Sequence, residues 1–251
     1  MDFLTKILTE KQHEIESLDP VIETVKKIRP SFYEGVKKDL ATIHIIGEIK
    51  RASPSKGIIN EAVDILEQAK KYEQAGVSAI SVLTDPIFFK GHINDLAAVA
   101  TVVDLPILCK DFIIDERQII RAKQAGASIV LLIVAAVSQE RLNKLYQFAT
   151  EQGLEVLVEV HDASELQRAQ LLGAKIIGVN NRNLKTFQVS IETSIQLKQA
   201  LGETVFVSES GFKNRQDIKK ILPYYQGVLI GETLMTVSDP MKKIKELKGL
   251  R

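Results

Sequence analysis

The sequence predicts an α/β fold in which eight parallel strands close into a (β/α)8 barrel. The first observation behind this prediction is a recurring unit, in which a helix-period stretch ends at glycine and a short apolar run follows at once. Three copies are centred on Gly76, Gly126 and Gly173. Glycine after the last helical turn provides a left-handed cap, and the apolar run is typical of a buried parallel strand. Each copy is therefore predicted to be the αβ half of a βα unit.

The second observation is the alternation of apolar runs with amphipathic stretches. Eight runs are predicted to be strands, at 43–49, 79–83, 106–109, 129–133, 155–160, 175–179, 205–208 and 227–230. Helices predicted between them include 63–74, 116–124, 139–150 and 191–200. This spacing, at about 20 to 35 residues per unit, is the TIM-barrel pattern. An open doubly wound sheet is the alternative, and it is disfavoured because no glycine-rich dinucleotide turn follows the first run.

The length of 251 residues suits one closed barrel, although it would also suit two small domains. We expect a single (β/α)8 TIM barrel domain over 1–251 with an N-terminal helical extension, in which 1–42 are the extension and 43–251 the barrel. Helices are predicted over 3–16 and 32–38 of the extension, with Pro20 and Pro30 between them. A barrel does not need this segment, so we expect it to pack across one barrel end.

Charge and composition limit the partners of the protein. The 33 basic and 32 acidic residues leave a formal net charge of +1, so no overall field attracts nucleic acid or a membrane surface. The longest apolar run, 129–137, is much shorter than the roughly 18 residues that a membrane span requires. The single cysteine, Cys109, cannot form an internal disulfide, which agrees with a reducing compartment. We therefore expect a cytoplasmic protein without nucleic-acid or membrane partners, and a monomer because the barrel has no obvious apolar patch.

Polar residues at the carboxyl ends of the predicted strands mark a candidate active site. They are Glu48 and Lys50 on the first strand, Lys110 on the third, Glu159 on the fifth, Asn180 and Arg182 on and after the sixth, and Glu209 after the seventh. Side chains alternate between the barrel interior and the outer helices, and these residues share the inward parity of their strands. This strand end carries function in such barrels, although any one of these residues could be a solvated loop residue. Two lysines and three glutamates at one rim are expected to stay ionised and to tune one another's pKa values for proton transfer.

The last two predicted loops have the features of a phosphate site. Ser210 and Gly211 follow the seventh strand, and Gly231 and Glu232 follow the eighth and open a short helix. Glycines let backbone N–H groups approach a phosphate, and barrels often bind phosphate at this pair of loops. Tight turns are the alternative explanation. The Glu232 carboxylate would have to turn away from the anion, because only its N–H is useful there.

Two weaker signals concern metals and flat ligands. The four histidines have no metal-ligand spacing, so we expect no metal site. Phe88, Phe89 and Phe112 lie just beyond the second and third strands. Core packing explains any one of them, but together they could form an aromatic wall for a flat ligand.

Five ordered blocks of the sequence resemble the indole-3-glycerol phosphate synthase family. They are 48–57 (EIKRASPSKG), 108–113 (LCKDFI), 158–161 (VEVH), 178–184 (GVNNRNL) and 208–211 (SESG). The similarity extends over essentially the whole chain, including the N-terminal extension. The departures from the family pattern are Arg51, where another lysine is common, and Glu232, where a small residue is frequent.

The resemblance implies an activity and a set of catalytic residues. The substrate would be 1-(2-carboxyphenylamino)-1-deoxyribulose 5-phosphate, which is cyclised, decarboxylated and dehydrated to indole-3-glycerol phosphate in tryptophan biosynthesis. Lys110 would be the acid for ring closure and Glu159 the proton shuttle for loss of water, with Lys50 as an alternative acid. Glu48 and Asn180 would orient the lysines and the sugar hydroxyls. No cofactor is expected, because protonation of the carbonyl oxygen during ring closure leaves a cationic imine that receives the electrons of the departing carbon dioxide.

The resemblance also implies binding residues for each part of the substrate. The set is Ser53, Phe89, Phe112, Leu131, Ile133, Arg182, Glu209, Ser210, Gly211, Gly231 and Glu232. Its apolar members would hold the aryl ring, and the last two loops would hold the phosphate. Either Lys50 or Arg182 would hold the aryl carboxylate or the phosphate.

Two other functions remain as alternatives. Phosphoribosylanthranilate isomerase, another phosphate-binding barrel, would need a cysteine base near the end of the first strand. The only cysteine, Cys109, is on the third predicted strand and is expected to face the outer helices as an inert core thiol. A barrel that only binds a sugar phosphate would not need the proton-transfer set of Glu48, Lys50, Lys110 and Glu159.

Overall fold

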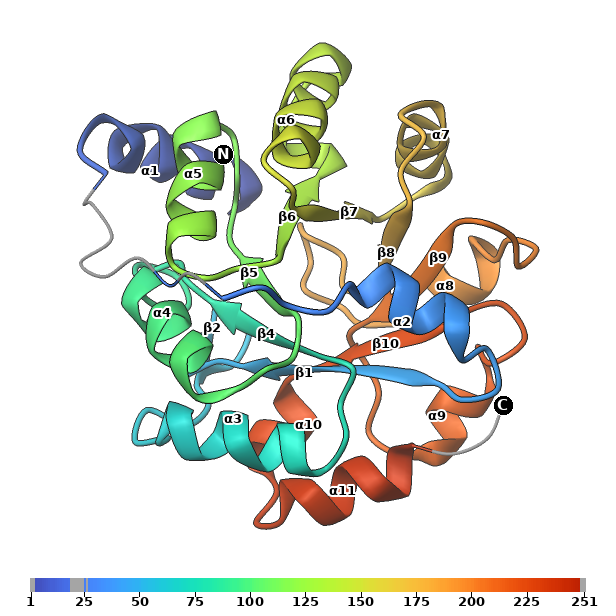
Figure 1. Ribbon diagram of the computed structural model, residues 1–251. Helices are drawn as coiled ribbons and strands as arrows, with labels where there is room; N and C mark the ends of the chain where they lie inside the picture. The colour runs from blue at the N-terminus through green and yellow to red at the C-terminus, as the bar shows by residue number, and fades with distance from the viewer. Residues whose placement is uncertain (1–2, 19–24, 26, 249–251) are drawn as a thin grey trace.

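The barrel is closed and entirely parallel in the computed structural model, which describes residues 3–18, 25 and 27–248 (Figure 1). Its strands are β1 (His44–Ile49), β4 (Ala79–Leu83), β5 (Ile107–Lys110), β6 (Ile129–Ile133), β7 (Glu155–Val160), β8 (Ile176–Asn180), β9 (Val205–Glu209) and β10 (Gly227–Ile230). The barrel closes at β1, where Ile46 is in register with Leu229 of β10 on one side and with Ala79 of β4 on the other. The eight predicted strands are confirmed within one residue at each end.

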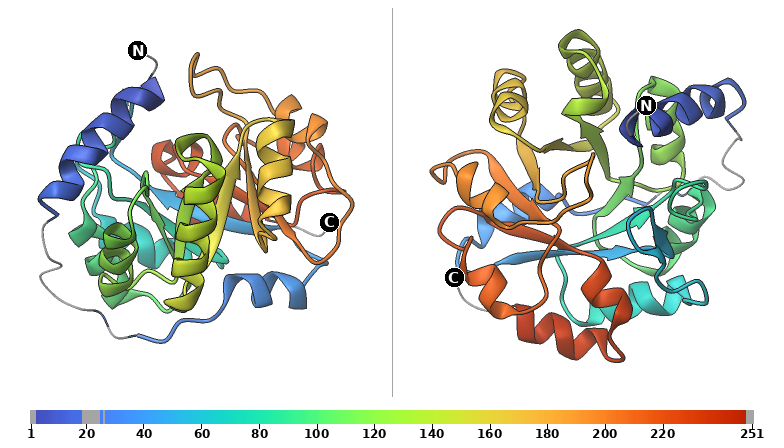
Figure 2. Two further views of the ribbon diagram at one scale, coloured as in Figure 1. Left: turned by 90° about the horizontal axis from the view of Figure 1, so that it is seen from above. Right: turned by 180° about the vertical axis from the view of Figure 1, so that it is seen from behind.

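The helices surround the strands, as Figures 1 and 2 show. They are α3 (Ile65–Gln74), α4 (Ile93–Val102), α5 (Glu116–Gln124), α6 (Gln139–Glu151), α7 (Ala163–Leu171), α8 (Glu192–Gln196), α9 (Arg215–Lys219), α10 (Glu232–Thr236) and α11 (Pro240–Leu247), with a 3₁₀ turn at Val134–Ala136. A short antiparallel hairpin of β2 (Ala52–Ser53) and β3 (Gly57–Ile58) follows β1. The glycines of the recurring unit have φ values of +80°, +95° and +73° at Gly76, Gly126 and Gly173, which confirms the predicted left-handed caps.

Two predicted helices differ from the observed ones for local reasons. The helix predicted over 63–74 begins at Ile65, because the Asp64 side chain accepts the N–H groups of Leu66 and Glu67 and caps it there. The helix predicted over 191–200 is only the short α8. The Ser194 carbonyl, which a longer helix would use internally, accepts the Tyr225 hydroxyl at 2.8 Å instead.

The core has two layers, one inside the barrel and one between the barrel and the helices. Alternate strand residues belong to different layers: Ile46 and Leu108 lie inside the barrel, whereas Ile45 and Cys109 pack against the helices. The predicted parity is therefore confirmed. Burial raises the pKa of Cys109 to about 12, so it is the inert core thiol that the sequence predicted.

The two helices of the N-terminal extension, α1 (Phe3–Glu16) and α2 (Phe32–Lys38), lie at opposite ends of the barrel (Figure 2, left). The N-cap of α2, Ser31, donates to Glu155 Oε1 at the amino end of β7, and the Phe32 N–H donates to Oε2. By contrast, α1 lies at the carboxyl ends, where Lys11 pairs with Asp111 just beyond β5. The expectation that the whole extension covers one end was therefore wrong, and Pro20 lies outside the described residues. Across the described part of the chain, no helix combines the length and the apolar character needed to span a bilayer.

Candidate active site

A cavity of about 440 Å³ lies at the carboxyl ends of the barrel strands. The residues predicted for the site that line it are Glu48, Lys50, Phe89, Lys110, Phe112, Leu131, Ile133, Glu159, Asn180, Arg182, Glu209, Ser210, Gly211, Gly231 and Glu232. They come from most of the barrel strands and the turns that follow them. The structure therefore brings together residues that are up to about 180 positions apart in sequence, as the inward parity predicted.

Lys110 is the centre of a buried charge cluster in this cavity. Its Nζ, at the end of β5, lies 2.8 Å from Glu159 Oε2 on β7 and 2.6 Å from Glu209 Oε2 on β9. The side chains of Glu159 and Glu209 are only 3% and 2% exposed, so both ion pairs are shielded from solvent. Glu209, which was predicted to bind substrate, lines the cavity and is also in direct contact with Lys110.

The three groups of this cluster have strongly shifted pKa values. Burial lowers the pKa of Lys110, but Glu159, Glu209 and Glu48 raise it by more, so it stays an ammonium at neutral pH. Burial raises the pKa of Glu159, but Lys110 and His161 together hold it well below its usual value. Burial, opposed by Lys110 and supported by the negative charge of Glu159, raises the pKa of Glu209 to about 7. Of the two glutamates beside Lys110, Glu209 is therefore the one whose pKa is raised, whereas the pKa of Glu159 is lowered.

Two glycines make room for the carboxylates of the site. A Cβ at Gly178 on β8 would overlap Glu209 Oε1, and a Cβ at Gly231 would overlap Glu48 Oε1. Glu209 Oε1 is buried and has no hydrogen-bond partner within 3–18, 25 and 27–248. This oxygen is therefore the free face of Glu209, held between Gly178 and the Lys110 ion pair.

A second charge pair lies on β1 and just beyond it. Lys50 Nζ is 2.7 Å from Glu48 Oε1, and both side chains line the cavity. Of the two lysines of the site, Lys50 is thus the one that Glu48 contacts directly. The pair provides a second ammonium group on the same side of the barrel mouth.

The apolar part of the cavity is formed by residues that follow β4 and β5 and by residues of β6. The rings of Phe89 and Phe112 are 6.1 Å apart and inclined at 35°, and Leu131 and Ile133 of β6 line the cavity with them. Phe88, the third predicted wall residue, instead packs edge-on against Phe3 of α1 at 5.3 Å. The aromatic wall therefore exists with two of its three predicted members, and it leaves a slot suited to a flat ring.

A cationic region faces this slot across the cavity. The Arg182 guanidinium donates to Ser55 Oγ at 2.8 Å, and the Ser210 hydroxyl donates to Asn180 Oδ1 at 3.0 Å. Ser210 and Gly211 have φ values of +69° and +94°, so the backbone turns sharply at this point. Such a turn beside a guanidinium suits an anionic group.

The Glu232 carboxylate does not turn away from this region, contrary to expectation. It lies 3.6 Å from Lys56 Nζ and 4.0 Å from an Arg182 guanidinium nitrogen, which are the cations nearest to it. All three side chains line the cavity. Glu232 therefore partly neutralises the positive charge of the region that was predicted to bind phosphate.

One serine predicted for the site lies outside the cavity, and several residues that line it were not predicted. Ser53 does not line the cavity; it lies in the β2–β3 hairpin, with its Oγ 3.5 Å from Ser55 Oγ. Ser55 and Lys56 do line it, and both were inside the 48–57 block. Phe187 also lines the cavity, from the loop after β8, where a positive φ of 58° turns the backbone. No strand parity applies to these loop residues, so no sequence signal selected them.

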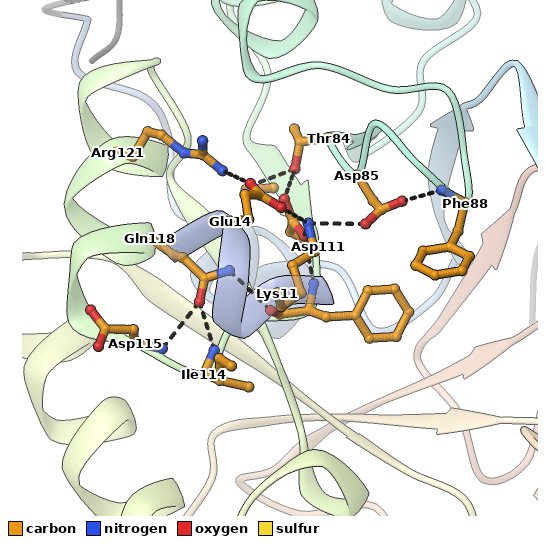
Figure 3. Close-up of polar contacts among 12 residues, drawn as sticks. Lys11, Glu14, Thr84, Asp85, Phe88, Asp111, Ile114, Asp115, Gln118 and Arg121 are labelled. Atoms are coloured by element: carbon orange, nitrogen blue, oxygen red, sulfur yellow. Dashed lines mark hydrogen bonds and ion pairs between the residues drawn. The ribbon is translucent and has the colours of Figure 1, made fainter. Parts of the chain in front are cut away.

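A buried ion cluster connects α1 to the rim of the cavity (Figure 3). Lys11 Nζ lies 3.0 Å from Asp85 and 2.7 Å from Asp111, and its side chain is 1% exposed. Asp85 Oδ1 accepts the Phe88 N–H at 2.6 Å, and Asp111 Oδ1 accepts the Phe112 N–H at 2.8 Å. One cation from the extension therefore holds the two turns that carry the aromatic wall.

The structure also bears on the other chemistries considered. Over the described part of the chain, no three His, Cys, Asp or Glu side chains are grouped as they would be around a metal ion. Cys109 lies on β5 and is buried against the outer helices, away from the end of β1 where the isomerase alternative would need its base.

Comparison with known proteins agrees with this geometry. The model of the indole-3-glycerol phosphate synthase family matches residues 4–247. Relatives named indole-3-glycerol phosphate synthase include one from Streptococcus gordonii, 50% identical, and one from Streptococcus sanguinis, 49% identical; in each case the match covers 98% of this chain and 97% of the relative.

Solved structures with low sequence identity share the fold. A 3-hexulose-6-phosphate synthase from Salmonella typhimurium gives a TM-score of 0.65 at 15% identity, over 82% of this chain and 96% of that one. A thiamine phosphate pyrophosphorylase from Pyrococcus furiosus gives 0.60 at 15% identity, over 82% and 93%. These two similarities show the barrel alone, whereas the family match and the close relatives cover nearly the whole chain. The chain belongs to the indole-3-glycerol phosphate synthase family.

Proposed function

We propose that this chain converts 1-(2-carboxyphenylamino)-1-deoxyribulose 5-phosphate to indole-3-glycerol phosphate, with Lys110 as the general acid of ring closure. The observation that carries the assignment is the position of Lys110, between two buried glutamates and beside an apolar slot. A barrel that only bound a sugar phosphate would gain nothing from three desolvated charges at this point, since their burial costs free energy.

Ring closure joins the aromatic carbon that bears the carboxylate to the ribulose carbonyl carbon. The carbonyl π electrons move to oxygen, which takes a proton from the Lys110 ammonium. At the same time the nitrogen donates its lone pair into the ring, so that a cationic imine forms. The raised pKa of Lys110 keeps this proton available at neutral pH. When the bond to carbon dioxide breaks, its electrons neutralise the imine and restore the aromatic ring, so the chemistry asks for no cofactor.

Loss of water then completes the indole ring. The hydroxyl leaves with a proton from an acid, and a base takes a proton from the neighbouring carbon. Glu159, which Lys110 and His161 keep ionised, is the proton shuttle of this step, and Lys50 is an alternative acid for the leaving hydroxyl. Glu209, with its pKa raised to about 7, can return a proton to Lys110 between steps.

The substrate is held at its two ends. The slot formed by Phe89, Phe112, Leu131 and Ile133 takes the aryl ring. The backbone N–H groups after β9 and β10 take the phosphate, and Arg182 or Lys50 holds the aryl carboxylate or the phosphate. Asn180 supports this end, because its side chain accepts from both the Ser210 hydroxyl and the Arg182 N–H at 3.0 Å.

The same proposal includes the organisation of the protein. Residues 1–251 form one domain, with 1–42 as the extension and 43–251 as the barrel, and the protein is a cytoplasmic monomer. A closed barrel supports the monomer because it leaves none of its eight strands with a free edge to pair with another chain.

The decisive experiment measures formation of the fluorescent indole product by the purified protein and its variants. In Lys110→Ala, kcat falls by about 10² or more while KM changes far less, as expected for loss of a general acid. Lys123→Ala, on the exposed face of α5, is the matched control and keeps normal turnover. Normal turnover of Lys110→Ala would remove Lys110 from the mechanism. Substrate binding without product by the unmodified protein would favour the non-catalytic binder.

A further inference from the structure

Glu159 has a second cationic neighbour besides Lys110. Its Oε2 faces Lys110 Nζ at 2.8 Å, and its Oε1 lies 3.2 Å from His161 Nε2. His161 is two residues beyond Glu159, so it has the same inward parity as the chain leaves β7. Each carboxylate oxygen of Glu159 is therefore paired with a different cationic side chain.

His161 is itself held from the opposite side. Glu165, in the first turn of α7, has its Oε2 3.0 Å from His161 Nδ1 and 2.8 Å from the His161 N–H. Asp162 caps α7 and accepts the Glu165 N–H at 2.9 Å, which fixes Glu165 in turn. The start of α7 therefore sets the orientation of the imidazole ring.

This geometry favours a charged imidazole. Each of the two ring nitrogens of His161 lies within 3.2 Å of a carboxylate oxygen, so two negative charges face the ring and stabilise its positive charge. The charged groups that face the ring are Glu159 from β7, Glu165 and Asp162 from the start of α7 and, beyond Glu159, Lys110 from β5. Burial lowers the pKa of His161, but the two glutamates outweigh it and raise the pKa to about 10.

His161 does not reach the substrate cavity. Its side chain is 12% exposed and is not among the residues that line the cavity, although Glu159 is. Its Nε2 makes no well-directed hydrogen bond with any described residue, so its contact with Glu159 is an ion pair. Any effect of His161 on the chemistry must therefore act through Glu159.

We propose that the His161 imidazolium is a positioning residue that keeps Glu159 ionised and aimed at Lys110. This inference rests on the proposed role of Glu159 as the proton shuttle. A carboxylate with one cation at each oxygen can neither rotate freely nor take up a proton before the chemistry requires it. Glu165 pairs with His161 in turn, so charges of alternating sign run from Glu165 on α7 through His161 and Glu159 to Lys110 in the barrel.

The first test follows protonation directly, independently of activity. The ring nitrogens of the four histidines are followed by ¹⁵N NMR titration, with His161 assigned from His161→Gln. In the unmodified protein, His161 stays doubly protonated well above pH 8, and in Glu159→Gln its pKa falls by at least about one unit. A His161 that titrates near the usual histidine pKa in the unmodified protein would overturn the proposal, even if indole product forms normally.

The second test separates a positioning role from a merely structural one. His161→Gln keeps a polar side chain but removes the charge, so kcat falls roughly 10-fold with KM nearly unchanged, and the acidic limb of the pH profile moves up by about one unit. Glu165→Gln leaves His161 protonated throughout the acidic limb, so this limb moves far less than in His161→Gln. His92→Gln, at the N-cap of α4, is the histidine control and keeps the original profile.

The possible outcomes of these two tests are distinguishable. A His161→Gln profile that superimposes on that of the unmodified protein, whatever happens to the melting temperature, refutes positioning through Glu159. If the unmodified protein forms no indole product but the pKa of His161 still falls in Glu159→Gln, the proposed function fails while the ion pair between His161 and Glu159 stands.

Discussion

Lys11→Met should destabilise the protein by several kcal/mol, because Lys11 is the buried cation between Asp85 and Asp111 (Figure 3). Its side chain is 1% exposed and methionine has a similar length, so the substitution removes the charge with little change in volume. Breaking a buried ion pair from one side typically costs about 3–5 kcal/mol, since the partner charges remain buried and unpaired. At about 2–4 °C per kcal/mol for a chain of this size, the melting temperature should fall by roughly 6–20 °C.

The loss should also depend on pH in a defined direction. Burial already raises the pKa of Asp85 in the unmodified protein, although Lys11 opposes it, whereas burial raises the pKa of Asp111 but Lys11 and Thr84 outweigh it and hold this pKa below its usual value. Without Lys11, both folded-state pKa values should rise. A carboxyl with a raised folded-state pKa loses stability as the pH rises through that value, so the deficit of the variant is largest at pH 7 and shrinks toward pH 4.

Urea unfolding of Lys11→Met at pH 4 to 8 measures this deficit. Lys6→Met, on the exposed face of α1, is the matched control and should stay within about 0.5 kcal/mol of the unmodified protein. In kinetics at low temperature, Lys11→Met should raise KM more than it lowers kcat, since Asp85 and Asp111 hold the turns of the aromatic wall. A loss below about 1 kcal/mol that is the same at every pH would refute the reasoning.

Two further predictions concern the buried cluster of Lys110. Gly178→Ala places a methyl group against Glu209 Oε1, so kcat should fall at least about 10-fold in a folded protein. Gly35→Ala, at a position in α2 with open space around it, is the control and should leave kcat unchanged. Equal turnover of the two variants would contradict this prediction. The pKa of Glu209 is raised from 4.5 to about 7, so its contribution to stability is present at low pH and is lost between about pH 4.5 and 7. From pH 4.5 to 7, the free energy of unfolding should therefore fall less in Glu209→Gln than in the unmodified protein, as measured by urea unfolding. If the two plots of unfolding free energy against pH run parallel, Glu209 does not titrate in this range.

The fold was predictable because the signals for parallel strands are local. A continuous apolar run identifies a buried strand without any knowledge of its neighbours, and all eight strands were found from such runs, three of them after a glycine cap. The placement of the extension was not predictable. It depends on pairs that are distant in sequence, Lys11 with Asp111 at one barrel end and Ser31 with Glu155 at the other.

The site residues on strands were likewise predictable, whereas those that depend on loops or distant contacts were not. Strand parity selected Lys110 and Glu159, because alternation along a strand is fixed by its geometry. Parity does not extend into the hairpin after β1, where Ser55 rather than Ser53 reaches the cavity. The His161 ion pair was also missed, because it depends on how the start of α7 places Glu165, which no pattern in the sequence encodes.

Burial and the arrangement of the charges explain why the pKa of one glutamate of the site is raised. Glu48, Glu159 and Glu209 share the barrel mouth with two ammonium groups, Lys50 and Lys110. Glu48 pairs with Lys50, and Glu159 pairs with Lys110 and His161, whereas the cation beside Glu209 is Lys110, which it shares with Glu159. It is also 1% exposed, so water cannot compensate. Burial is thus the largest cause that raises the pKa of Glu209 to about 7, and the negative charges of Glu159 and Glu48 add to it while Lys110 opposes it. A carboxyl with this pKa can both give and take a proton at neutral pH.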